Sequence, residues 1–153
     1  MLALVFEIAG EKFAVPASRV VSVIRKPVMR SVIGVPPWVL GLFPWADGWV
    51  PVVDLCQLIT HTPCPAGAAS RIAVVEHMRG AARRPLGLLA PGMTRVTDLS
   101  TAAKPGIHLP GKPFLGGITD GDEHGVQLLE IDRVLPSEHD TLLFGGAAGA
   151  STE

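Results

Sequence analysis

Glycine and proline occur so often in this chain that long helices have little room to form. The 153 residues include 17 Gly and 14 Pro, and both residue types destabilise the interior of a helix. The uncharged segment of residues 31–46 contains three of the prolines, and it is too short to cross a bilayer as a helix. The sequence therefore favours short strands joined by tight turns, the pattern of an all-β protein.

The length and the charge balance narrow the class of protein further. A chain of this size can bury enough surface to form one core without a metal or disulfide crosslink. Hydrophobic residues make up 48% of the chain, charged residues 18%, and the net charge is -1. This balance predicts a soluble globular protein and argues against binding along the phosphate backbone of a nucleic acid.

Two sequence features bear on where the protein works. The N-terminal residues lack the basic start and the cleavage site of a signal peptide. Cys56 and Cys64 are the two cysteines of the chain, and they do not make the framework of a disulfide-stabilised secreted domain. We therefore expect a reduced protein in the cytoplasm.

Local patterns predict short strands and one helix. Apolar and β-branched runs indicate strands over residues 4–8, 13–15, 20–24, 42–43, 49–53, 72–75, 86–89, 93–99, 114–118 and 126–131. Asp54 is a helix-capping residue type, and the apolar residues at 55, 58 and 59 have helical spacing. Single helical turns are expected near residues 16–18 and 132–135. Residues 34–41 contain two prolines and are not expected to form a regular strand.

A weak internal repeat indicates how the domain is organised. Residues 38–41 resemble residues 113–116, and each segment leads to an Asp-Gly turn and then to a strand that closes on an acid and an aliphatic residue: Asp47-Gly48 with Asp54-Leu55, and Asp120-Gly121 with Glu130-Ile131. A predicted hairpin precedes each unit. Any β meander can look repetitive, but a true repeat predicts two small barrels that share one core. We expect this domain to cover residues 1–136, followed by a tail over 137–153 that is disordered from about residue 145.

Cys56, His61 and Cys64 lie close together in the sequence, and His77 and His108 are further candidate metal ligands. A zinc site takes four N or S ligands, usually with closely spaced pairs. Only His61 and Cys64 have such spacing, and no second pair follows. We therefore favour a buried Cys56 with His61 and Cys64 in a loop, and we expect no metal and no cofactor.

Motifs for catalysis or phosphate binding are lacking. The chain has no Gly-x-Ser-x-Gly and no Gly-x-x-x-x-Gly-Lys, and Asp120-Gly121-Asp122 is not followed by the later ligands of a calcium loop. Arg79, Arg83 and Arg84 lie in a predicted hairpin loop. We interpret them as a solvated face, with an acid-binding patch as the alternative. No catalytic residue is predicted.

Three tryptophans, Trp38, Trp45 and Trp49, lie within a Pro-rich segment of a chain that has no Tyr. Trp45 and Trp49 flank the Asp47-Gly48 turn. Large aromatic side chains at such a turn either cap the end of a barrel or anchor a binding partner. The sequence leaves both interpretations open for Trp45 and Trp49 and favours the core for Trp38.

Residues 41–55, Gly-Leu-Phe-Pro-Trp-Ala-Asp-Gly-Trp-Val-Pro-Val-Val-Asp-Leu, resemble the CheW-like family of bacterial chemosensory coupling proteins. The positions that match the family pattern without a gap are Gly41, Pro51, Val52, Val53, Asp54 and Leu55. Further matches at residues 6–15, 35–37, 114–117 and 128–131 extend the resemblance over most of the chain. Ala46 is a departure, because the family has at this position an Arg associated with partner contact. Alanine supplies neither its charge nor its donors.

The resemblance implies a fold of two intertwined, SH3-like, five-stranded β-barrels. It implies a non-enzymatic adaptor whose partners are the regulatory domain of a CheA-type histidine kinase and the cytoplasmic tip of a methyl-accepting chemoreceptor. Such an adaptor is cytoplasmic, associates with receptor arrays at the inner membrane, and neither inserts into the membrane nor binds nucleic acid.

The change at Ala46 indicates a partner surface rebuilt around Trp45 and Trp49, an alternative chemosensory pathway, or the loss of one of the usual partners. The candidate partner-binding residues are Phe43, Trp45 and Trp49. Two competing hypotheses are a small metal-assisted enzyme that uses Cys56 with neighbouring ligands, and a nucleic-acid-binding β-barrel.

Overall fold

The computed structural model describes residues 1–46, 48–65, 69–79, 81–93, 95–99, 112–119 and 125–135. Within these ranges the strands are β1 (Leu2–Ile8), β2 (Glu11–Pro16), β3 (Val20–Arg25), β4 (Val39–Trp45), β5 (Gly48–Asp54), β6 (Ser70–Arg79), β7 (Ala82–Pro91), β8 (Arg95–Asp98), β9 (Leu115–Thr119) and β10 (Val126–Leu129). The helices are short, and they are the α-helix α1 (Leu55–Thr60) and the 3-10 turns η1 (Ala17–Arg19) and η2 (Ile131–Arg133). The all-β prediction is confirmed.

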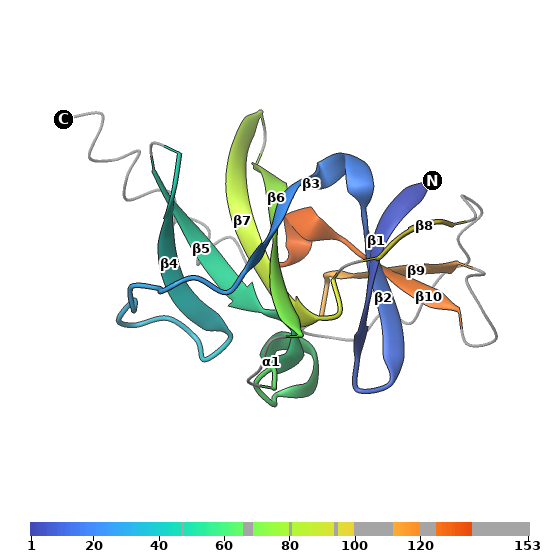
Figure 1. The fold of residues 1–153 in the computed structure, drawn as a ribbon, viewed down its shortest axis with the longest axis horizontal. Coiled ribbons are helices and arrows are strands. Elements are labelled where there is room, and N and C mark those ends of the chain that lie inside the picture. Colours follow the sequence, from blue (N-terminus) through green and yellow to red (C-terminus); the bar gives the residue numbers. More distant parts are fainter. Residues whose placement is uncertain are drawn as a thin grey trace.

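The strands form two five-stranded sheets. Sheet A has the order β8-β1-β2-β10-β9, and sheet B has the order β3-β6-β7-β5-β4. In Figure 1 sheet A lies on the right and sheet B on the left, with α1 between them at the lower edge of the view. This arrangement agrees with the two five-stranded units that the family resemblance implies.

The two sheets share one plan, in which the second strand of an antiparallel hairpin also pairs in parallel with a strand from elsewhere in the chain. The hairpin is β1–β2 in sheet A and β6–β7 in sheet B, and the parallel pairs are β2–β10 and β7–β5. Each sequence unit pairs with the other unit's hairpin, however. The hairpin that precedes residues 38–55 joins β9 and β10, and the hairpin that follows them joins β4 and β5. Sheet A therefore unites the N-terminal strands with the C-terminal ones.

Backbone hydrogen bonds place the repeat one residue away from the alignment that the sequence predicted. The N–H of Asp54 donates to the carbonyl of Trp38 at 2.8 Å, and the N–H of Glu130 donates to the carbonyl of Phe114 at 2.7 Å. Trp38 is therefore the counterpart of Phe114, whereas the sequence alignment matched Trp38 with Pro113. The apolar residues around both positions are so similar that the sequence alone does not distinguish the two alignments.

The largest apolar cluster is shared by the two sheets. It combines Leu4 and Phe6 of β1 with Val75 of β6 and Leu86 and Leu88 of β7, all almost completely buried. A second cluster belongs to sheet B, and its buried members are Phe43, Val50, Val52, Ile72, Val74 and Leu89. Since each such side chain contributes about 1.5–3 kcal/mol when removed from water, the shared cluster fixes one sheet against the other. Within the described residues, no helix is long and apolar enough to cross a membrane.

Some boundaries differ from the sequence prediction. Strand β4 begins at Val39, inside the segment expected to be irregular, because the prolines end at Pro37 and the following residues are free to pair. Strand β8 begins at Arg95 instead of residue 93, and the last helical turn begins at Ile131 instead of Asp132. Asp47, His108, the acidic turn at 120–124 and the tail at 137–153 lie outside the described residues.

Candidate partner-binding surface

The β4–β5 hairpin carries the three aromatic residues that the sequence analysis assigns to partner binding. Its strands are antiparallel, with Trp45 opposite Gly48 and Pro44 opposite Trp49. Ala46 follows β4 with a positive φ of 51°, a conformation typical of tight turns between paired strands. The turn therefore fixes both tryptophans near the tip of the hairpin.

The three aromatic side chains differ in exposure. Phe43 is 2% exposed and belongs to the cluster of sheet B. Trp45 is half-buried, packs against the same cluster and lies edge-on to Phe43, with ring centroids 6.1 Å apart. Trp49 is 54% exposed. Trp49 is therefore the most accessible of the three, while Phe43 supports Trp45 from the interior; partner contact by these residues stays a prediction. Trp38 packs against the shared cluster, as expected.

Two exposed aliphatic residues beside this hairpin were not predicted from the sequence. Val28 is 93% exposed and Ile33 is 97% exposed, in the segment between β3 and β4. Between them, Arg30 exchanges two backbone hydrogen bonds with Leu42 of β4, at 2.7 and 2.8 Å. We call the strongly exposed Val28, Ile33 and Trp49 the β4-edge surface. Trp45 lies on the opposite face of the hairpin from Trp49, because Trp49 pairs with Pro44 and successive residues of a strand point to opposite faces. In the sequence, Val28 and Ile33 lie in an apolar segment that prolines interrupt. Such a segment does not form a regular strand or helix, so its apolar side chains are more easily left exposed.

Gly41 allows that segment to approach β4. An ideal Cβ placed on Gly41 would lie 2.5 Å from the carbonyl oxygen of Arg30, a distance that real Cβ atoms do not reach. The pairing of β4 with β5 also shifts register between Val39 and Gly41. The family glycine is therefore a structural residue that brings the Arg30 segment against the sheet.

The other motif residues are structural as well. Pro51, Val52, Val53, Asp54 and Leu55 are all buried. The parallel pairing with β7 begins at Val52, so Pro51, which has no N–H, lies just outside that ladder. Val52 faces the cluster of sheet B and Val53 faces the shared cluster. The motif thus builds the strand that both clusters use.

Asp54 connects the end of β5 to α1 and to the loop that follows the helix. Its Oδ1 accepts from the N–H of Gln57 at 3.1 Å, which caps the helix as the sequence predicted. Its Oδ2 accepts from the N–H of Cys64 at 3.0 Å. Because Asp54 is only 2% exposed, both contacts occur in an environment where an unpaired polar group is costly.

The structure corrects one sequence interpretation, because Cys56 and Cys64 form a disulfide with their Cα atoms 5.0 Å apart. The number of cysteines gave no reason to expect the bond. In the structure, the hydrogen bond from the N–H of Cys64 to Asp54 holds the loop close to α1. Cys56 is buried, and His61 and Cys64 lie in the loop after the helix, as expected. His61 is exposed at the end of α1 and His77 is buried in β6. Among the described residues, Asp54, Cys56 and Cys64 have potential metal-ligand atoms within 4.8 Å of one another. The two sulfurs are bonded to each other, however.

The arginine-rich β6–β7 hairpin fits the interpretation as a solvated face. Arg83 and Arg84 are exposed, and the guanidinium of Arg83 lies 3.2 Å from the carboxylate of Glu76. An exposed pair of this kind contributes little stability and partly neutralises the local charge.

A charged contact joins the two sheets at another point. Arg19 of η1 donates to both carboxylate oxygens of Asp132 of η2 and to the carbonyl of Glu76 in β6. Burial alone raises the pKa of Asp132, but the hydrogen bonds from Arg19 and from the N–H of Met78, with the charges of Arg19 and His77, together hold that pKa below its ordinary value of 3.8. The contact therefore favours an ionised Asp132 in the folded protein.

Comparison with known proteins places this architecture in a family. Residues 2–139 match the CheW-like domain. A segment of 73 residues is 30% identical to the protein PilI of Pseudomonas aeruginosa, and it covers 48% of this chain and 41% of that protein.

The fold agrees with a solved structure. The crystal structure of the scaffolding protein TtCheW from Thermoanaerobacter tengcongensis aligns with a TM-score of 0.76 and 19% identity, over 88% of this chain and 87% of that chain. The match over nearly the whole chain shows that this protein belongs to the CheW-like domain family.

Proposed function

We propose that this protein is a non-enzymatic scaffold that couples a methyl-accepting chemoreceptor to the regulatory domain of a CheA-type histidine kinase. It would act in the cytoplasm, at receptor arrays on the inner membrane. The observation that carries this proposal is Trp49, 54% exposed on a hairpin built by the family motif. Membership of the CheW-like family and the likeness to a scaffolding protein support it.

The β4-edge surface has the properties of a docking site on a rigid body. Trp49 and the nearly fully exposed Val28 and Ile33 lie on either side of β4, which pairs with β5 along one edge and with Arg30 at a single bridge through Leu42 on the other. Tryptophan is enriched among the residues that carry most of the binding energy of an interface. An interface of modest area is sufficient, because assembly in an array raises the effective concentration of each partner.

Ala46 supports assignment to an alternative chemosensory pathway. It is exposed at the tip of the hairpin, where the family Arg would offer a charge and a fork of donors. Recognition at this tip therefore relies on the apolar surface of Trp49 in place of a charged hydrogen bond. A partner kinase or receptor should present an apolar pocket there.

The proposal is tested by measuring binding of the full chain to two purified fragments from the same organism, a CheA-type regulatory domain and a receptor cytoplasmic tip. Titration calorimetry should detect binding to both fragments, and Trp49→Ala should weaken binding to at least one of them roughly tenfold or more. Val96→Ala is the matched control, because Val96 is 57% exposed but lies on β8 of sheet A.

Two results would contradict the proposal. The coupling role fails if either fragment shows no binding at concentrations of about tens of micromolar, a range that includes weak signalling contacts. The assignment of the β4-edge surface fails if Val96→Ala weakens binding as much as Trp49→Ala.

A further inference from the structure

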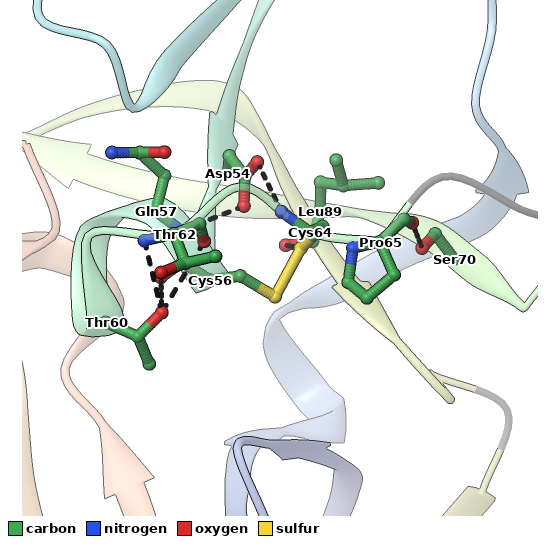
Figure 2. The surroundings of a disulfide bond; sticks show 9 residues. All are labelled: Asp54, Cys56, Gln57, Thr60, Thr62, Cys64, Pro65, Ser70 and Leu89. Atoms are coloured by element: carbon green, nitrogen blue, oxygen red, sulfur yellow. Dashed lines mark hydrogen bonds between the residues drawn. A yellow bond between two sulfur atoms is a disulfide. The ribbon is translucent and has the colours of Figure 1, made fainter.

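The disulfide joins Cys56 of α1 to Cys64 in the loop that follows the helix, and the two cysteines differ in exposure. Cys56 is 5% exposed and belongs to the shared cluster, whereas Cys64 is only partly buried. Figure 2 shows the bond beneath Asp54, with Cys64 at the point where the loop turns toward Pro65. A reagent from solvent therefore meets Cys64 before Cys56.

The loop is also held by contacts that do not depend on the sulfur–sulfur bond (Figure 2). The N–H of Cys64 donates to Asp54 Oδ2 at 3.0 Å, and Thr60 Oγ1 donates to the carbonyl of Cys56 at 2.7 Å. The N–H of His61 donates to the carbonyl of Gln57 at 2.9 Å, which closes the end of α1. These bonds keep the two cysteines adjacent when the disulfide is reduced, so that re-oxidation requires no search by the chain.

The surroundings accommodate the reduced pair. The Sγ of Cys64 lies 3.6 Å from the carbonyl oxygen of Leu89, which becomes a hydrogen-bond acceptor as soon as that sulfur carries a proton. The carboxylate of Asp54 lies within 4.8 Å of both sulfurs.

We propose that Cys56 and Cys64 form a reversible thiol–disulfide exchange site whose co-reactant is a protein or small-molecule dithiol. The thiolate of the dithiol attacks Sγ of Cys64, the Cys64–Cys56 bond breaks, and Cys56 leaves as a thiolate that takes a proton from solvent. The second thiol of the reductant then attacks the mixed disulfide and releases Cys64 as a thiol. Two electrons and two protons pass to the protein, and the reductant becomes a disulfide.

The position of the site connects its redox state to the rest of the molecule. Cys64 packs against both the shared cluster and the cluster of sheet B. The carbonyl of Ile59, in the same helix as Cys56, accepts from Lys112 Nζ at 2.9 Å, just before β9. Reduction therefore loosens a crosslink at the point where elements of both sheets meet.

The test uses the full chain equilibrated in buffers of graded reduced and oxidised dithiothreitol, followed by alkylation and mass spectrometry. We expect the folded protein to pass between disulfide and dithiol forms, with the same midpoint from either direction. Circular dichroism on the same samples should show an unchanged β signal. The proposal is overturned if the bond resists excess dithiol until the protein is unfolded, or if the reduced protein fails to re-form it under oxidising buffer.

Two single variants test which sulfur reacts. In Cys56→Ser the remaining Cys64 should form a mixed disulfide with oxidised glutathione roughly tenfold faster than Cys56 does in Cys64→Ser, because thiol reactivity follows access. Equal rates, or a faster reaction in Cys64→Ser, would contradict attack at Cys64. The wild-type measurement stands without these variants if either one folds poorly, and none of the readouts involves a signalling partner.

Discussion

Arg19 and Asp132 form an ion pair although 113 positions separate them in the chain. Arg19 follows β2 and Asp132 follows β10, so both belong to segments that leave sheet A. Both residues also bond to the backbone of β6 in sheet B, at the carbonyl of Glu76 and at the N–H of Met78. The pair therefore fastens the exits of two parallel neighbours to the opposite sheet.

Replacing Arg19 should weaken the contact between the sheets. Arg19→Ala removes the donors to Asp132 and Glu76, and we expect the free energy of unfolding to fall by about 1–2 kcal/mol, because the contact is charged but partly exposed. Arg19→Lys should lose less, since it keeps the charge but not the fork of donors. Urea denaturation measures both, with the exposed Arg25→Ala as the control. A change no larger than in Arg25→Ala would contradict this role.

The same pair predicts a dependence of stability on acid. The folded protein holds the pKa of Asp132 below 3.8, so its stabilising contribution is complete above pH 3.8 and is lost as pH falls through the lower, folded-state pKa. Urea denaturation over a pH series should show wild type more stable than Asp132→Asn at neutral pH. The difference should shrink only below pH 3.8, and a constant difference into strong acid would speak against the assignment.

Asp54 should be costly to replace because each carboxylate oxygen has a backbone donor. Asp54→Ala leaves the N–H groups of Gln57 and Cys64 without their acceptor, and we expect a loss of about 2 kcal/mol in the free energy of unfolding. Asp54→Asn should lose less, since one acceptor oxygen remains to cap α1. Chemical denaturation under fixed redox conditions checks the order, and equal losses would show that only one of the two contacts contributes.

Gly41 and Gly48 offer a matched pair of alanine substitutions in the same hairpin. At Gly41 a Cβ meets the carbonyl of Arg30 at 2.5 Å, whereas at Gly48 it meets nothing within 4 Å. Gly41→Ala should therefore cost about 1–3 kcal/mol through overpacking, and Gly48→Ala should be close to neutral. Thermal unfolding compares the two, and similar melting temperatures would mean that the Arg30 segment moves aside freely.

The two hairpin tryptophans should separate stability from binding. Trp45→Ala removes a half-buried ring that packs on Phe43, and we expect a stability loss of about 1–3 kcal/mol, less than for a fully buried aromatic residue. Trp49→Ala should change stability by less than about 0.5 kcal/mol, as is usual at exposed positions. Thermal melts of both variants decide this, and a large loss for Trp49→Ala would place that ring in the core.

Features set by neighbouring residues could be read from the sequence. The turn at Ala9 and Gly10 joins β1 to β2, with both residues at positive φ, and such a hairpin is visible as two apolar runs around a glycine. The helix after Asp54 follows from a capping residue and apolar spacing. Gly41 and Pro51 match the family pattern in the sequence, and the structure adds a reason for each: the close approach of Arg30 to Gly41, and the position of Pro51 just outside the ladder with β7.

Features set by distant residues could not be read in the same way. The parallel pairing of Phe13 with Gln127 leaves no local trace, so the sequence could not show that each unit pairs with the hairpin of the other unit. The sequence likewise gives no indication of the ion pair between Arg19 and Asp132, because charged residues near turns are common. The number of cysteines does not indicate the disulfide. In the structure, the backbone of Cys64 is held beside α1 by its hydrogen bond to Asp54.

The assignment of strands to sheets has a consequence during protein synthesis. Sheet B is complete once the ribosome has produced β7, but β2 waits for β10 before it gains its second neighbour. During that interval the apolar face of β6 and β7 lacks the cover that β9 and β10 will supply, and pairing over such a separation is slow. Premature termination between the end of β7 and the end of β10 should therefore yield a product with exposed apolar surface that chaperones and proteases recognise, even though every strand of sheet B is present.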